Sequence, residues 1–250
     1  MNSSGPDSPR ILPAVGKYWS ERAELSGFFT ATRDLIAALW EFVRDSTPSR
    51  LRSRFGDADY DWDYRVNTTS GAVGWRDRLL GVFHSPYQPT ERALFHEMIA
   101  TVAKHTKLNF AEFTFIDLGS GKGRALLMAS DYPFRRIVGV ELIPSLHEIA
   151  RQNVAQYKSD SQRCSRIETT CADAAEFDFP EGPLLVYLFN PLPESGLRRT
   201  ITNLARSLEM NPRAAYILYH NPQLEHVLME TTKFEKIAGT QQFSCFTVSK

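Results

Sequence analysis

Residues 117–123 (DLGSGKG) combine one carboxylate with three closely spaced glycines, a composition suited to binding a small ligand. Glycine has no side chain, so it lets the backbone turn tightly and approach a ligand closely. The spacing fits neither the phosphate-loop pattern G-x-x-x-x-G-K-S/T nor the dinucleotide pattern G-x-G-x-x-G, because Arg124 stands at the sixth position from Gly119. The carboxylate of Asp117 would also repel a pyrophosphate. We therefore expect a ligand that carries positive charge in place of phosphates.

Further polar residues follow the ends of later strand-like segments. Glu141 ends the segment RIVGVE, where its carboxylate can accept hydrogen bonds from two hydroxyl groups. Asp173 and Ala174 follow the next such segment, and Asn190-Pro191 follow the one after it. Because the carboxyl ends of parallel strands meet at one edge of a sheet, we expect these residues to surround one ligand. Each also has a simpler reading, Asp173 as a helix N-cap and Asn190-Pro191 as a turn.

These polar residues stand in a regular alternation of strand and helix patterns. The predicted strands are 113–118, 136–141, 167–171, 184–190, 214–220, 234–238 and 243–248, and the predicted helices are 91–107, 123–131, 145–157 and 194–209. Thr90 is expected to cap the first helix. The alternation predicts a parallel sheet with helices on both faces. Only GTQQ joins the last two strands, so they must pair as a hairpin, which places one antiparallel strand in the sheet.

Composition narrows the class of protein. The chain has 250 residues, of which 42% are hydrophobic, and its 29 basic residues balance 29 acidic ones, so no global field attracts nucleic acid or anionic membranes. Cys164, Cys171 and Cys245 have no disulfide or zinc spacing and are expected to be free thiols, and the six histidines form no ligand-spaced pair, so no metal is expected. No signal peptide or membrane span is visible. We expect a reduced, cytoplasmic enzyme.

The motifs together resemble those of the class I S-adenosylmethionine-dependent methyltransferases. DLGSGKGR is similar to the first motif of that family, and VGVE, CADAAEFDF and LFNPLP follow at the intervals of its later motifs. S-adenosylmethionine suits the expected ligand, because it has a sulfonium and an α-amino group and no phosphate. The resemblance covers roughly residues 90–250. It implies a Rossmann-like α/β fold, a mostly parallel seven-stranded sheet with one antiparallel strand near the C-terminus.

The resemblance also implies which residues hold the cofactor. They are Tyr87, Thr90, Asp117, Gly119, Ser120, Gly121, Glu141, Asp173, Ala174 and Asn190. Among them, Glu141 would bind the ribose hydroxyls and Asp173 the adenine amino group. The segment Tyr87-Gln88-Pro89-Thr90 is similar to a Y-x-P-T segment of the bacterial group related to the histone-lysine methyltransferases that lack a SET domain.

The fourth motif concerns the methyl acceptor. Asn190-Pro191 resembles the Asn-Pro motif of methyltransferases that act on nitrogen, which implies that Asn190 orients a neutral amine and that both residues are catalytic. Leu192-Pro193 follow where an aromatic residue often stands, which disfavours an adenine or cytosine target. His220 is either a base at the same edge or a structural histidine. A protein amine is the leading acceptor, with a small molecule, RNA or a non-catalytic cofactor-binding role as alternatives.

The first third of the chain is expected to be an extension. Residues 1–16 are rich in Ser, Pro and Gly and are predicted to be disordered, and residues 17–89 form a helical and loop extension before the methyltransferase domain at 90–250. Residues 18–45 have helical spacing, and their apolar face, including Phe28, Phe29 and Ile36, is predicted to pack on the domain or on a second subunit of a homo-oligomer.

Charged segments on either side of the domain boundary are expected to face water. The basic stretch PSRLRSR and the acidic stretch GDADYDWDY after it are predicted to form a solvated loop. Lys122 and Arg124 are predicted to begin a helix and to face solvent or the sheet edge.

Overall fold

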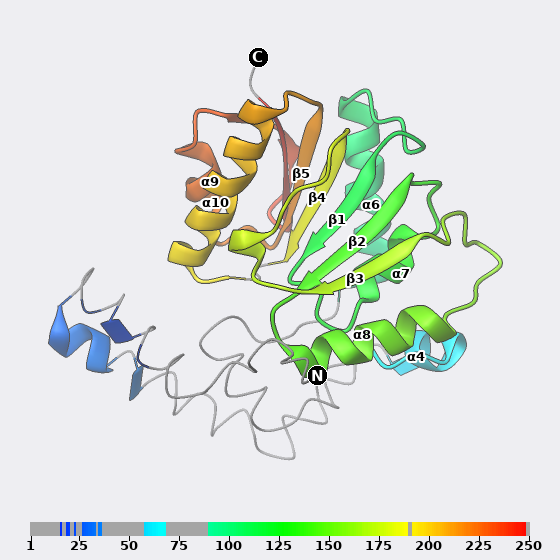
Figure 1. Ribbon diagram of the computed structural model, residues 1–250, viewed down its shortest axis with the longest axis horizontal. Coiled ribbons are helices and arrows are strands. Elements are labelled where there is room, and N and C mark those ends of the chain that lie inside the picture. Colours follow the sequence, from blue (N-terminus) through cyan, green and yellow to red (C-terminus); the bar gives the residue numbers. More distant parts are fainter. Residues whose placement is uncertain are drawn as a thin grey trace, which may run out of the picture.

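The computed structural model describes residues 16, 19–20, 23, 27–33, 35–36, 58–68, 90–189 and 192–248. Within these ranges, seven strands form one sheet in the order β3-β2-β1-β4-β5-β7-β6 (Figure 1). The strands are β1 (Thr114–Leu118), β2 (Arg136–Glu141), β3 (Ile167–Cys171), β4 (Leu184–Phe189), β5 (Ala215–His220), β6 (Phe234–Gly239) and β7 (Phe243–Val248).

The pairing of the strands confirms the predicted fold class. β1 to β5 pair in parallel, whereas β7 runs antiparallel to both of its neighbours, β5 and β6. β7 is therefore the single antiparallel strand that the short hairpin predicted. Predicted segments 136–141, 167–171 and 243–248 match β2, β3 and β7 residue for residue. β1, β4 and β5 are buried along almost their whole length, because helices cover both faces of the sheet.

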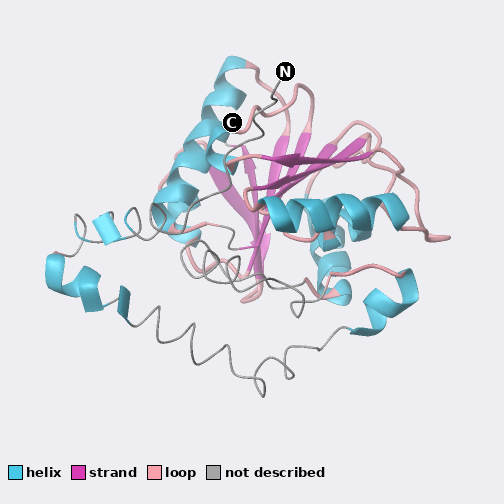
Figure 2. Cartoon of the chain, turned by 60° about the horizontal axis from the view of Figure 1, so that its bottom comes forward, coloured by secondary structure: helices cyan, strands magenta, loops and turns pink. Residues whose placement is uncertain are grey.

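Two hydrophobic cores lie on opposite faces of the sheet, between its strands and the helices that Figure 2 shows on both sides. The first packs under α6 (Arg92–His105) and α7 (Arg124–Ala129), and α8 (Pro144–Gln156) lies beside β2 and β3. The second packs under α9 (Glu194–Met210) and α10 (Glu225–Met229), a short helix that was not predicted. Neighbouring strand residues alternate between the cores, as Phe115 and Ile116 do.

The predicted N-cap of the first domain helix is wrong. α6 begins at Arg92, its N-cap residue is Glu91, and no side chain caps it. The Thr90 hydroxyl instead bonds to the hydroxyl of Tyr187 on β4, at 2.8 Å. A buried tyrosine hydroxyl needs a partner, and Thr90 is close enough to provide one.

The acidic stretch is a docked helix, not a solvated loop. Residues Ala58–Tyr64 form α4, and Tyr60 on it is only 6% exposed. Tyr60 and Tyr64 are one helical turn apart, with ring centroids separated by 4.7 Å, and Tyr64 packs on Tyr157 at the end of α8. Val66 joins the same core. Residues 58–68 therefore pack as part of the domain.

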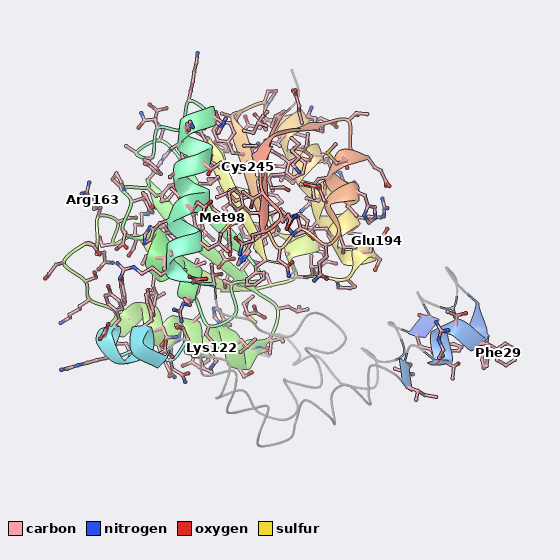
Figure 3. The ribbon with its side chains drawn as sticks, turned by 180° about the vertical axis from the view of Figure 1, so that it is seen from behind. Phe29, Met98, Lys122, Arg163, Glu194 and Cys245 are labelled. Atoms are coloured by element: carbon pink, nitrogen blue, oxygen red, sulfur yellow. The ribbon has the colours of Figure 1, made fainter. Side chains whose placement is uncertain are left out.

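The N-terminal helix is not continuous. Gly27 has φ +83° and donates its N–H to the carbonyl of Ala23, which ends one helical segment, and a second begins immediately after it. Phe28, Phe29 and Ile36 are 61%, 87% and 62% exposed, so these side chains do not pack on the domain as predicted. Figure 3 shows Phe29 well away from the sheet and its helices. Most of residues 1–16 lie outside the described residues.

No helix in the described ranges combines the length and the apolar character that crossing a membrane would require.

Candidate active site

The glycine turn lies at the carboxyl end of β1 and folds back onto β2. Gly119, Gly121 and Gly123 have φ values of +80°, +53° and +83°, in the left-handed region that favours glycine. The N–H groups of Gly119 and Ser120 both donate to the carbonyl of Val140, at 2.8 and 3.0 Å. These two amides are bonded within the protein, which agrees with a ligand that is not held through phosphates.

Gly139 on β2 makes this close approach possible. A Cβ atom at Gly139 would lie 2.6 Å from Cδ1 of Leu126 and 2.9 Å from Oγ of Ser120. The Ser120 hydroxyl thus faces β2, is enclosed, and has no partner among the described residues. Sequence reasoning missed Gly139, although a glycine inside an apolar strand is a recognised sign of close backbone approach.

Two buried carboxylates lie beside the turn. Asp117 is 3% exposed and Glu141 is 6% exposed. Glu141 accepts hydrogen bonds from the N–H groups of Gly121 and Ile143, both at 2.8 Å, whereas no described residue donates one to Asp117. Burial, and next the charge of Glu141, raises the pKa of Asp117 well above its usual range. A positively charged ligand would stabilise the ionised form of the Asp117 carboxyl, so the residues present fit S-adenosylmethionine.

Glu141 stabilises the glycine turn by accepting the hydrogen bond from the N–H of Gly121. Burial raises its pKa, and the hydrogen bonds from the backbone of Ile143, Gly121 and Leu142 act against this. A carboxylate oxygen accepts more than one hydrogen bond, so these contacts leave capacity for ribose hydroxyls. The ribose contact stays a prediction.

Asp173 is an N-cap, as its simpler reading proposed. Its Oδ1 accepts the N–H of Ala175 at 2.9 Å, at the start of the short 3₁₀ helix Ala174–Glu176. Its Oδ2 accepts a 3.3 Å hydrogen bond from Arg199 on α9, a partner that sequence reasoning missed. Ala174 is buried below it. The predicted contact with adenine would have to use the lone pairs of the Asp173 carboxylate that accept no hydrogen bond from Ala175 or Arg199.

A buried hydrogen-bonded line joins Thr90, Tyr187 and His220. The Tyr187 hydroxyl lies 2.8 Å from Oγ1 of Thr90 and 2.9 Å from Nδ1 of His220. The rings of Phe189 and His220 stack with centroids 3.8 Å apart. Burial lowers the pKa of His220 to about 4, so its imidazole is neutral at neutral pH.

Lys122 and Arg124 are buried, contrary to the prediction. Lys122 is 0% exposed and donates to Oδ1 of Asn67 at 3.0 Å. Arg124 is 2% exposed, donates to Oγ1 of Thr68 at 3.2 Å and lies over the Tyr60 ring at 4.2 Å. Residues 58–68 dock on the turn and cover both cations, and Figure 3 shows Lys122 near α4. Burial lowers the pKa of Lys122 to about 8, although the charge of Asp61 acts against this.

Three predicted site residues, Tyr87, Asn190 and Pro191, lie outside the described residues, so their roles stay predictions. Of the other predicted cofactor residues, the structure brings Asp117, Glu141 and the glycine turn together at one edge of the sheet.

Comparisons with known proteins agree with this site. Residues 115–211 match the sequence profile of a methyltransferase domain. No curated protein sequence matches the chain. Together with the sheet order and the glycine turn, the profile match marks residues 115–211 as a methyltransferase domain, and the residues present at its turn fit S-adenosylmethionine.

Several solved structures are similar in fold. The glycopeptide N-methyltransferase MtfA with S-adenosylhomocysteine has a TM-score of 0.48 and 12% identity, over 64% of this chain and 87% of that one. Magnesium protoporphyrin IX methyltransferase from Synechocystis PCC 6803 has a TM-score of 0.46 and 12% identity, over 80% of this chain and 96% of that one. An RNA methyltransferase from Salinibacter ruber has a TM-score of 0.43 and 18% identity, over 64% of this chain and 92% of that one. The acceptors differ among these proteins, so none is inferred from them.

Proposed function

We propose that the enzyme transfers a methyl group from S-adenosylmethionine to a nitrogen atom, with a protein amine as the leading acceptor. The observation that carries the proposal is the position of the LFNPLP motif: β4 ends at Phe189, directly before Asn190, and lies beside β1, which leads into the glycine turn. The resemblance of the Y-x-P-T segment to the non-SET lysine methyltransferase group favours a protein substrate.

The protein has three tasks in such a reaction. The cofactor supplies a methyl group that is already activated on a positively charged sulfur. Asp117 and Glu141 provide negative charge where the cofactor binds, and the glycine turn allows its close approach. Asn190 would accept an N–H hydrogen bond from the acceptor and so aim its lone pair, which is a positioning effect.

A small molecule or an RNA is the alternative acceptor. The balanced charge of the chain, 29 basic against 29 acidic residues, gives RNA no general attraction. A non-catalytic regulatory or scaffold subunit is less well supported, because a scaffold need not keep the set formed by Asp117, Glu141 and Asp173.

The Asn190→Ala variant tests the nitrogen assignment. We expect its affinity for S-adenosylhomocysteine to stay nearly unchanged while turnover falls on the order of 100-fold, because the lost hydrogen bond aligns the acceptor in the transition state. Binding is measured by calorimetry. Turnover is measured with radiolabelled methyl groups on cell extract that is separated into protein, RNA and small-molecule fractions.

The matched control is Asn211→Ala, which alters an exposed asparagine after α9 and should leave both quantities unchanged. Label found only on oxygen or carbon, with Asn190→Ala as active as the parent, would overturn the nitrogen assignment. The methyltransferase activity would still stand in that case.

A further inference from the structure

His220 ends β5, beside the strand that leads to Asn190. Most of the predicted cofactor residues follow β1, β2 and β3, on one side of the sheet order β3-β2-β1-β4-β5, and Asn190 follows β4. Under the proposed function, this leaves the side of β4 and β5 for the methyl acceptor. His220 is the last residue of β5 and pairs in register with Phe189, the last residue of β4.

The imidazole ring of His220 is held in place by two contacts. Tyr187 bonds to Nδ1 at 2.9 Å, and the Phe189 ring stacks on the imidazole. Tyr187 is itself fixed by Thr90. After His220 the chain turns at Asn221, whose φ of +48° and hydrogen bond to the Gln242 carbonyl end the strand abruptly. The ring orientation is thus determined by its surroundings.

The second ring nitrogen remains available. His220 is 6% exposed, and no described residue bonds to its Nε2. An imidazole nitrogen in a site that is otherwise apolar normally forms a hydrogen bond. A ligand at the edge of β4 and β5 can provide the missing partner.

We propose that His220 contacts the methyl acceptor through Nε2, and that Tyr187 is the positioning residue that holds the ring. This proposal rests on the proposed function and extends it from Asn190 to β5. The acceptor nitrogen forms the new bond to the methyl carbon as the carbon–sulfur bond breaks. The methylated nitrogen is then positively charged, and it releases one N–H proton to water.

His220 acts in this role as a neutral hydrogen-bonding group. The groups that face it are Tyr187 and Phe189 from β4 and Phe243 from β7, and none of them is charged at neutral pH. Burial alone keeps its pKa low. Its neutral form therefore persists across the pH range in which amines become reactive.

Two substitutions separate a contact with the acceptor from a structural role. In His220→Asn the amide lies near the Nδ1 position, so the bond to Tyr187 can persist, whereas in His220→Gln the amide reaches the Nε2 position. We expect both variants to bind S-adenosylhomocysteine as the parent does. Turnover on the labelled fraction should fall about tenfold in His220→Gln and about 100-fold in His220→Asn.

Tyr187→Phe tests the positioning role. It should lower turnover about tenfold without changing the affinity for S-adenosylhomocysteine, because only the ring orientation is disturbed. The matched control is Tyr216→Phe, which removes a hydroxyl from the same face of β5 at its other end and should change neither quantity. If His220→Asn were fully active, the bond to Tyr187 would be the whole role of His220 and the proposal would fail.

Accessibility is tested without any acceptor. Diethylpyrocarbonate modifies neutral imidazole, so at pH 5.5 His220 in the intact protein should react while ordinary exposed histidines are mostly protonated. Mass spectrometry of the peptides identifies the modified residue. An unreactive His220 would overturn the proposal and leave the proposed function standing. Failure to find label on nitrogen, with a reactive His220, would instead overturn the proposed function.

Discussion

Asp117 shows how a predicted binding residue can lower the stability of the folded protein. It is buried beside Glu141, and no described residue donates a hydrogen bond to it. Its pKa is therefore higher in the folded than in the unfolded chain. The folded state binds more protons between these two pKa values, so the contribution of Asp117 to stability decreases as the pH rises through this window.

The Asp117→Asn variant should be more stable and bind its cofactor less well. Without ligand, we expect it to gain roughly 0.5–2 kcal/mol of unfolding free energy at pH 7, because the buried charge is removed. Binding of S-adenosylhomocysteine should weaken about 10- to 100-fold, since a hydrogen bond to a charged group contributes roughly 1.5–3 kcal/mol. Urea denaturation and calorimetry measure the two effects.

Asp178→Asn, at an exposed position, is the control and should change neither property. An Asp117→Asn variant that binds S-adenosylhomocysteine as tightly as the parent would remove Asp117 from the cofactor site.

At the scale of elements, one side chain joins the segment 58–68 to the glycine turn. Oδ1 of Asn153 on α8 accepts the N–H of Asn67 at 2.8 Å, and its Nδ2 donates to the carbonyls of Asn67 and Lys122, both at 2.9 Å. Asn153 is 1% exposed. Its amide thus satisfies backbone groups of two segments that are far apart in the sequence.

The Asn153→Ala variant should release residues 58–68. Buried backbone groups would lose their partners, and we expect a loss of roughly 2–5 kcal/mol of unfolding free energy. Limited proteolysis should then cut within 58–68 before the domain unfolds. Gln152→Ala changes the exposed neighbouring residue and serves as the control. Equal protease resistance and stability within about 0.5 kcal/mol of the parent would contradict the role of Asn153.

At the scale of the whole molecule, the first residues contribute little to the domain cores. The ring of Trp19 packs on Phe28, and its indole N–H donates to Thr32, so these contacts stay within the segment. Phe28, Phe29 and Ile36 are exposed, whereas the described residues that form the cores on the two faces of the sheet begin at Tyr60.

A variant lacking residues 1–45 should therefore remain folded. We expect its melting temperature by calorimetry to lie within a few degrees of the full chain, because the described residues of this part belong to neither core. The predicted homo-oligomer through the N-terminal helix should dissociate, which light scattering after gel filtration would detect. Loss of cooperative unfolding in the truncated protein would show that residues 1–45 do support the domain.

Local patterns in the sequence were enough for the sheet and for the centre of the site. Strand residues in β2 and β7 follow from apolar runs between turn residues, and the hairpin of β6 and β7 follows from its short connection. The glycine turn beside Asp117 was also predicted, because positive φ values and close approach are properties of glycine itself. Each of these depends on residues close together in the chain.

The tertiary structure decided which polar groups are buried and what they contact. Lys122 faces Asn67, which is 55 residues earlier in the chain, and Thr90 faces Tyr187, 97 residues later. The local sequence predicted that Lys122 would face solvent or the sheet edge and that Thr90 would cap a helix. Burial depends on segments from elsewhere in the chain that fold over a residue, and the local sequence around that residue does not indicate which segments these are.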